Sequence, residues 1–293
     1  MGDLSEVGAG ERRAVTIHGP SSWGDHRFQD RAVLPAVEAM QLLANECQRY
    51  RPAMNVHRIG RARFDKFLAL PPDGGPVDAY CDLVHLPDGG LRTALLTRVQ
   101  ARSARISRVV THARVDFLPD DGTPAPRKGN PSAPLAEDCF KVDPPLIYSQ
   151  LVPFGPAYRN IVQPLMLNRR GARAVIQAPD HLPSVGSLGS PYVLDAAFHA
   201  ACVWGQRFAG VVAFPVALAE RRILAPTRPG GEYIGRIRPL GQEEGMLRFD
   251  LDITDPHGQW YEWVRGVDMR DVSGGRLKPP GWIRRGGSKK ECR

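Results

Sequence analysis

Hydrophobic residues recur at helical spacing in two stretches of the chain. Pro35 opens the first, a helix predicted over about residues 35–50, and Pro191 opens the second, predicted over about 191–208. One face of the first helix is apolar and carries Val37, Met40, Ala44 and Cys47. Glu38 and Gln41 fall outside this face. The pattern therefore predicts two half-buried helices of similar length, one in each half of the chain.

A strict alternation of apolar and polar residues marks several strands. It covers residues 77–86 and 109–117 in the first half and 247–253 in the second. Hairpin turns are predicted at 87–90, Pro-Asp-Gly-Gly, and at 255–258, Asp-Pro-His-Gly. Since neighbouring strands joined by tight turns run antiparallel, an antiparallel sheet is expected around each helix.

The two halves follow the same plan. In each, the proline that opens the helix precedes a Gly-Gly turn by forty residues, Pro35 to Gly75 and Pro191 to Gly231. A stretch rich in proline, glycine and polar residues separates the halves. We expect a duplicated α+β unit, each copy an antiparallel sheet wrapped around one long central helix. The predicted segments are a disordered leader (1–11), an N-terminal unit (12–118), a linker (119–136), a C-terminal unit (137–272) and a flexible basic tail (273–293).

Composition narrows the classes of function. The net charge of +8 suits nucleic acid or an acidic protein partner, but the arginines are dispersed and no nucleic-acid-binding motif occurs. A solvated basic surface with a basic tail is therefore preferred to nucleic-acid binding, and an acidic carrier protein stays open as a partner. Five scattered cysteines without a Cys-x-x-Cys pair indicate a reducing compartment, the cytoplasm, and argue against a metal site. No apolar run of about eighteen residues and no signal-peptide pattern is present, so no membrane span or export is expected.

Three side chains combine into a candidate site. His26 lies in a loop before the first helix, whose N-terminal N–H groups favour developing negative charge. Asp195 and His199 share one face of the second helix at i, i+4 spacing, among small apolar residues. If the two units pack face to face, an imidazole and a carboxylate meet in an apolar tunnel. These are the groups that β-elimination requires, one to take a proton α to a thioester carbonyl and one to protonate the leaving hydroxyl.

The motifs around these residues resemble the dehydratase domain of polyketide synthases, a double hot-dog fold. That family carries His-x-x-x-Gly-x-x-x-x-Pro, and residues 26–35 here read His-Arg-Phe-Gln-Asp-Arg-Ala-Val-Leu-Pro. It carries Tyr-Gly-Pro-x-Phe, which residues 154–158 match as Phe-Gly-Pro-Ala-Tyr. Leu194 followed by Asp195 to His199 matches its Asp-x-x-x-Gln/His motif, and residues 213–216 echo its Leu-Pro-Phe strand. The four motifs occur in the family's order.

The resemblance implies roles for these residues. His26 would be the catalytic base, Asp195 the acid and His199 the residue that orients Asp195. The implied substrate-binding residues are Asp30, Pro35, Phe154, Gly155, Tyr158 and Phe214. The substrate would be a β-hydroxyacyl thioester on the phosphopantetheine of an acyl carrier protein, with no metal or nucleotide cofactor. Carrier proteins are acidic, which agrees with the basic surplus. Other polyketide or fatty-acid synthase subunits and a homodimer are also implied, and the chain would act in trans or as an excised domain.

Two departures from the motifs keep alternatives open. Asp30 replaces the motif glycine and puts a carboxylate where an enolate would develop, and Phe154 replaces the motif tyrosine and lacks its hydroxyl. The His26 and Asp195 pair is intact. Double-bond isomerisation and aldol-type cyclisation need the same proton transfers as dehydration. A non-catalytic hot-dog module that binds an acyl carrier is the alternative of a different class.

Overall fold

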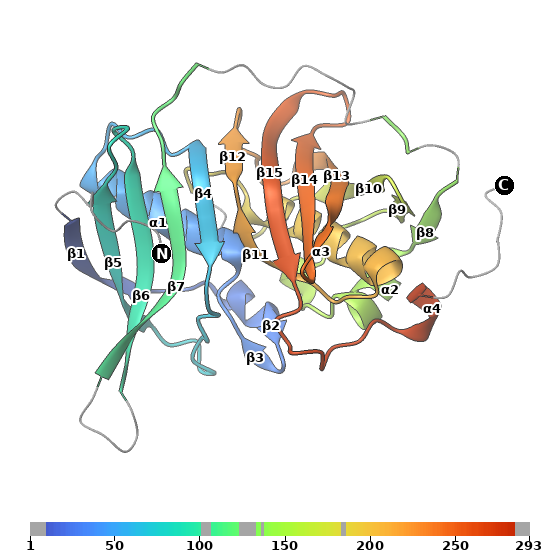
Figure 1. The fold of residues 1–293 in the computed structure, drawn as a ribbon, viewed down its shortest axis with the longest axis horizontal. Helices are drawn as coiled ribbons and strands as arrows, with labels where there is room; N and C mark the ends of the chain where they lie inside the picture. The colour runs from blue at the N-terminus through green and yellow to red at the C-terminus, as the bar shows by residue number, and fades with distance from the viewer. Residues whose placement is uncertain (1–9, 101–106, 123–132, 136–137, 183–185, 285–293) are drawn as a thin grey trace.

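The computed structural model describes residues 10–100, 107–122, 133–135, 138–182 and 186–284. Within these ranges one large antiparallel sheet of 13 strands runs across the molecule, in the order β1-β5-β6-β7-β4-β11-β15-β14-β13-β10-β9-β8, with β12 between β4 and β15. The long helices α1 (Ala36–Tyr50) and α3 (Pro191–Trp204) both lie behind the sheet in Figure 1. The architecture is the predicted double hot-dog, with its two sheets joined into one.

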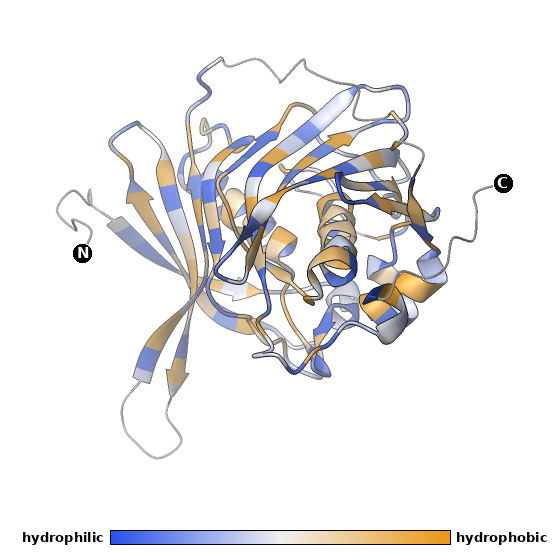
Figure 2. Ribbon diagram, turned by 45° about the vertical axis from the view of Figure 1, so that its right-hand side comes forward, coloured by the Kyte–Doolittle hydropathy of each residue, from blue (hydrophilic) through white to orange (hydrophobic). Residues whose placement is uncertain are grey.

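The first half supplies five strands of the large sheet and a small hairpin. The strands are β1 (Gly10–Ile17), β4 (Arg58–Phe64), β5 (Val77–His85), β6 (Leu91–Gln100) and β7 (Ser107–Phe117). A 3₁₀ turn at Ser21–Asp25 and the hairpin β2 (Arg27–Phe28) and β3 (Arg31–Ala32) separate β1 from α1. The alternation predicted for 77–86 and 109–117 therefore marks real strands, and Figure 2 shows the resulting bands of apolar and polar residues.

The second half supplies the remaining strands. They are β8 (Phe140–Val142), β9 (Leu165–Asn168), β10 (Gly171–Gln177), β11 (Phe214–Leu218), β12 (Glu220–Ile223), β13 (Glu232–Glu243), β14 (Met246–Thr254) and β15 (Trp260–Arg270). Short helical segments are α2 (Pro144–Leu146), π-helical turns at Ile147–Leu151 and Gly205–Ala209, a 3₁₀ turn at Pro156–Tyr158, and α4 (Gly281–Arg284). The predicted hairpin at 255–258 joins β14 to β15.

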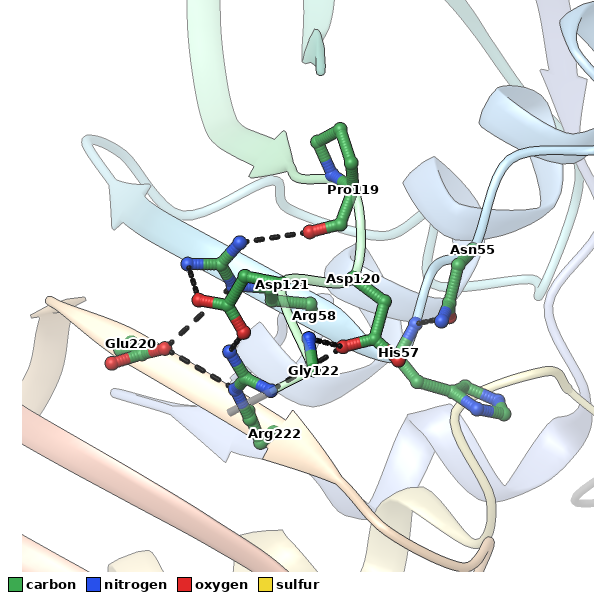
Figure 3. Close-up of polar contacts among 9 residues, drawn as sticks. All are labelled: Asn55, His57, Arg58, Pro119, Asp120, Asp121, Gly122, Glu220 and Arg222. Atoms are coloured by element: carbon green, nitrogen blue, oxygen red, sulfur yellow. Dashed lines mark hydrogen bonds and ion pairs between the residues drawn. The ribbon is translucent and has the colours of Figure 1, made fainter. Parts of the chain in front are cut away.

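The two halves meet at a seam where β4 pairs with β11 and β12. At one end of this seam, a network of ion pairs and hydrogen bonds holds residues 119–122, which follow β7 (Figure 3). The Arg58 guanidinium donates to the Pro119 carbonyl at 2.8 Å and pairs with Asp121 at 2.7 Å. Arg222 from β12 pairs with the same Asp121 and lies 3.5 Å from Glu220. The start of the predicted linker is thus fixed across both halves.

The helix α1 is buried on more sides than its apolar face suggests. Glu38 is 7% exposed and Gln41 is 8% exposed, because α3 and the segment before it pack on this side. The backbone N–H of Leu188, just before α3, donates to the Gln41 side chain at 3.3 Å. The central helices of the two units are therefore neighbours, as the face-to-face arrangement requires.

The predicted ends of the chain need correction. β1 begins at Gly10, two residues inside the expected leader, because its backbone pairs with β5 from Gly10 onward. The expected tail is ordered from residue 273 to 284. Ile283 is fully buried, its carbonyl accepts from Arg207 at 2.8 Å, and the Trp282 indole donates to Gln150 at 2.7 Å. The apolar Trp-Ile pair anchors a segment whose composition alone looked like a solvated tail.

Candidate active site

The histidine predicted as the base is held at the start of the small hairpin. The 3₁₀ turn Ser21–Asp25 ends at His26, whose N–H donates to the Trp23 carbonyl at 3.2 Å. The His26 carbonyl accepts from Val33 at 2.9 Å, just before α1. Both bonds fix the backbone of His26 beside the N-terminus of α1.

The carboxylate from the other half meets this imidazole. Asp195 lies on α3, with Oδ1 at 4.0 Å from His26 Nε2 and Oδ2 at 2.8 Å from His199 Nε2. The side chains of His26, Asp195 and His199 are 12%, 6% and 5% exposed. The contact to His199 is close, but its angles do not meet those of a hydrogen bond. The structure therefore brings together all three residues predicted to be catalytic.

Burial sets the charge state of this cluster. It lowers the pKa of His26 to about 4, although the Asp195 carboxylate acts to raise it. Burial alone would raise the pKa of Asp195, but His199 and then His26 lower it, and the net result lies below its usual value. At neutral pH, a neutral His26 therefore faces an ionised Asp195.

We expect the imidazole of His26 to titrate near pH 4, measured by NMR of the histidine ring nitrogens, because burial penalises its cation. The unfolded chain then binds a proton between about pH 6.5 and 4 that the folded chain does not, so stability should fall as the pH is lowered through this range. Urea denaturation at several pH values measures this slope. His26→Gln should flatten it, and an equally steep slope in that variant would refute the assignment.

A cavity of about 520 Å³ opens beside the His26 and Asp195 pair, here called the dyad, and is mostly apolar. His26, Phe154, Asp195, Phe198 and His199 line its interior, and Phe214 lies at its mouth beside Phe67. Cys202 also lines it, and burial raises the pKa of this thiol to about 11, so the thiol stays protonated and is a poor nucleophile. A pocket with these groups can hold an acyl chain and move protons at carbon.

Phe154 stands between the two imidazoles. Its ring centroid is 4.2 Å from that of His26 and 5.1 Å from that of His199. Tyr158 packs edge-on against the His26 ring at 5.1 Å, is fully buried and is not part of the cavity wall. Its hydroxyl therefore does not replace the one that Phe154 lacks.

Gly155 supports the site from behind. Its N–H donates to the Asp25 carbonyl at 2.8 Å, and the N–H of Ala157 donates to the Asp25 carboxylate at 2.9 Å. A Cβ on Gly155 would lie 2.3 Å from the Asp25 side chain, so only glycine permits this approach. Pro35 plays a similar supporting part as the N-cap of α1. Neither residue lines the cavity.

Asp30 lies away from the dyad. It is exposed in the two-residue turn between β2 and β3 and is not part of the cavity wall. Gln29 and Asp30 have φ of 48° and 63°, the left-handed region that hairpin turns of this type require and that glycine adopts without strain. The motif glycine thus corresponds to a turn position here.

Asp30→Gly is expected to stabilise the fold by about 0.5 kcal/mol, because relief of left-handed strain, about 1–2 kcal/mol, exceeds the chain-entropy cost of glycine. Urea denaturation measures the change. Asp73→Gly is the matched control: Asp73 also lies in a turn, but its own φ is not positive, and its carboxylate accepts from the Gly75 N–H at 3.1 Å. That variant should lose stability. A loss in Asp30→Gly would contradict the strain argument.

Several cavity residues were not predicted, and His112 is the most informative. It falls on the polar side of the alternation in β7, yet it is 8% exposed and lines the cavity next to Ala113. A β-bulge, where β7 shifts register against Leu95 and Leu96 of β6, turns both residues inward. Its Nε2 lies 2.8 Å from the Thr97 hydroxyl and its Nδ1 lies 3.1 Å from the Lys66 carbonyl, which fixes the loop after β4.

Within the described ranges, no group of three or more His, Cys, Asp and Glu side chains is suited to hold a metal ion. Among the helices of the same ranges, none combines the length and apolar character that a membrane crossing demands.

Solved structures with the same fold are dehydratase domains. One from a mycocerosic acid synthase-like polyketide synthase matches with a TM-score of 0.72 at 16% identity, covering 90% of this chain and 95% of that one. A trans-AT polyketide synthase dehydratase domain from Brevibacillus brevis matches with 0.69 at 17%, covering 90% and 94%. The bifunctional dehydratase-cyclase domain in ambruticin biosynthesis matches with 0.65 at 18%, covering 89% and 91%. No curated protein matches the chain.

The fold is the one that these dehydratase domains share. The family model described as "Polyketide synthase dehydratase N-terminal domain" matches residues 130–279, just over half of the chain. The chain belongs to this family of polyketide synthase dehydratase domains.

Proposed function

We propose that the protein removes water from a β-hydroxyacyl thioester carried by an acyl carrier protein and yields the α,β-unsaturated thioester. The single observation that carries this proposal is the meeting of His26 and Asp195, from different halves of the chain, in one largely apolar cavity. Family membership supports a dehydration role in polyketide synthesis. The carrier and neighbouring polyketide synthase subunits are the partners that we expect.

His26 acts as the base in this proposal. Its low pKa keeps the ring neutral at physiological pH, so the Nε2 lone pair is available to take the proton α to the thioester carbonyl. Ala36, in the first turn of α1, lines the cavity, and the N–H groups of this turn have no helical partners. They are suited to hold the carbonyl oxygen as negative charge develops on it.

Asp195 acts as the acid. An acyl chain that fills the cavity displaces water from the carboxylate, which raises its pKa and favours the protonated form. The C–O bond then breaks as Asp195 gives its proton to the leaving hydroxyl, forming water. His26 is now a cation and Asp195 an anion, 4.0 Å apart before the reaction, so a proton can return to Asp195 for the next cycle. His199 holds the other carboxylate oxygen at 2.8 Å.

The test is incubation of the protein with 3-hydroxybutyryl-pantetheine and with longer β-hydroxyacyl analogues, followed by mass spectrometry. We expect a product lighter by one water, and loss of turnover in His26→Ala. Turnover that persists in His26→Ala would show that the base is misplaced. Absence of turnover at all chain lengths, with the fold intact, would favour the non-catalytic carrier-binding module.

The same assay distinguishes the neighbouring chemistries. An isomerase moves the double bond of an unsaturated thioester without a change in mass. A cyclase closes a ring when a longer substrate offers a second reactive group. Supplying these substrates in parallel shows which reaction the His26 and Asp195 pair catalyses.

A further inference from the structure

A groove lined with arginines crosses the outer face of the sheet at the seam. Arg61 and Arg63 of β4 form one wall, and Arg248 of β14 and Arg270 of β15 form the other. Its floor consists of small residues, Ala217, Ala219 and Gly266.

The strand register explains the groove. Arg63 pairs with Ala217 of β11, Ala217 pairs with Asp268 of β15, and Asp268 pairs with Arg248 of β14. These residues form one row across four strands, and their side chains point to the same side of the sheet. Because the residue in the middle is alanine, the long side chains at either end stand over a low floor.

The groove carries a surplus of positive charge. Its four arginines face two carboxylates, Asp65 and Asp268. Asp268 forms an ion pair with Arg248 at 2.7 Å. Asp65 lies 3.2 Å from Arg114 and 3.8 Å from Arg63. In the part of the chain that the structure describes, neither Arg61 nor Arg270 has an ion-pair partner, and both are exposed. A partner with acidic side chains would complete these pairs.

Several other arginines of the sheet already have carboxylate partners. Arg12 is paired with Asp82, Arg92 with Asp116, and Arg221 with Glu262. Arg61 and Arg270 of the groove, in contrast, remain available to an acidic partner.

The groove leads to the mouth of the cavity. Phe64, Asp65, Val216 and Arg270 line both. These residues lie at the end of β4, in β11 and at the end of β15, where the strands stop and the cavity opens. A partner seated in the groove is thus beside the entrance and can pass a flexible arm around the strand ends towards the dyad.

We propose that this arginine groove is the docking surface for the acidic face of the acyl carrier protein that delivers the thioester. This assignment rests on the proposed function, since it takes the carrier as the source of substrate. Charge complementarity identifies the partner: an acidic protein surface fits four arginines above a narrow floor, and steering of this kind acts mainly on association rate.

The experiment compares two substrates in three proteins. The substrates are 3-hydroxybutyryl-pantetheine and the same acyl group on a holo acyl carrier protein. The proteins are wild type, Arg61→Glu/Arg63→Glu in the groove, and Arg98→Glu/Arg108→Glu as a control of equal charge change. Arg98 and Arg108 are exposed near the end of β6 and the start of β7, in the hairpin that projects from the body in Figure 1.

We expect the groove variant to lose about tenfold or more in kcat/KM on the carrier-borne substrate, with KM rising and kcat nearly unchanged. Turnover of the soluble thioester should stay within about twofold of wild type, because neither Arg61 nor Arg63 lines the cavity. The control variant should match wild type on both substrates. In wild type, raising the salt concentration should lower kcat/KM on the carrier-borne substrate relative to that on the soluble thioester, since exposed charges are screened.

This experiment gives different results when the docking proposal fails and when the proposed reaction fails. If the groove variant keeps the full rate on the carrier, or if the control loses as much, the groove is not the docking surface. If wild type turns over neither substrate, the proposed reaction fails. Binding of the holo carrier is then measured directly by calorimetry, where loss in the groove variant alone supports docking and equal binding overturns it. Binding of a duplex DNA probe instead of the carrier also overturns it.

Discussion

Asp195→Asn is expected to lower kcat on a β-hydroxyacyl thioester by about 10²–10⁴-fold, the usual contribution of a positioned acid. The amide has nearly the same shape as the carboxylate but cannot deliver a proton to the leaving hydroxyl. Asp195 is buried between His26, at 4.0 Å, and His199, at 2.8 Å, so the substitution removes the carboxyl group from this point of the cavity. KM should change little. Steady-state kinetics on 3-hydroxybutyryl-pantetheine measures both constants.

A second readout separates chemistry from structure. The Asp195 carboxylate raises the pKa of His26 against the larger effect of burial, so its removal should move that pKa below its wild-type value of about 4. NMR of the histidine ring checks this shift. Cys202→Ala is the matched control, since Cys202 lines the same cavity on the same helix but stays a neutral thiol. A similar loss of kcat in this control, or full activity in Asp195→Asn, would remove Asp195 from the mechanism.

His26→Ala in the Asp195→Asn background tests whether the two residues form one unit. Groups that act together show strongly non-additive losses, so the double variant should be about as slow as the worse single variant. Independent losses that multiply would indicate two separate functions for the pair.

Local patterns predicted the elements of this fold well. The helices after Pro35 and Pro191 form as α1 and α3, because the helical period of apolar residues and an opening proline act within a few turns of chain. The sequence could not show that β4 pairs with β11 and β12 and joins the two sheets, since strand partners distant in sequence leave no local signal. The fixed position of residues 273–284 depends likewise on burial of Ile283 in the second half.

In the candidate site, too, local features were predicted from the sequence and features that depend on distant contacts were not. Asp195 and His199 are one helical turn apart, so their meeting follows from helix geometry. The approach of His26 from the other half was predicted only through the internal repeat and the family motifs. His112 was missed because a β-bulge breaks the period-two pattern. A bulge depends on register between two strands, which is set by the whole sheet.

The largest effect on stability is expected from a buried ion pair at the seam. The Arg221 guanidinium of β12 donates to the Glu262 carboxylate of β15 from Nε at 2.8 Å and lies 2.6 Å from it through Nη2. The two side chains are 3% and 4% exposed. Glu262→Ala leaves the buried arginine charge without its carboxylate partner, which should cost about 3–5 kcal/mol. Urea denaturation measures the loss.

Two comparisons define the cause of this loss. Arg221→Met/Glu262→Leu removes both charges and fills similar volume, so it should regain most of the stability lost in Glu262→Ala. Asp82→Ala breaks the Arg12 pair, whose side chains are 48% and 27% exposed, and should cost less than about 1 kcal/mol. If Glu262→Ala lowers the free energy of unfolding by no more than Asp82→Ala does, the buried, unpaired charge of Arg221 is not the cause of the loss.

The Arg221 and Glu262 pair lies close to the start of α3, the helix that carries Asp195. Arg221 lies 3.5 Å from the Leu188 carbonyl, just before the helix that carries Asp195, and β12 pairs with β4 of the other half. At temperatures where Glu262→Ala remains folded, we expect kcat near the wild-type value, because no reacting group is changed. Asp195→Asn should give the opposite pattern, a folded protein with little turnover. A parallel loss of activity and stability in both variants would mean that the seam and the dyad do not act separately.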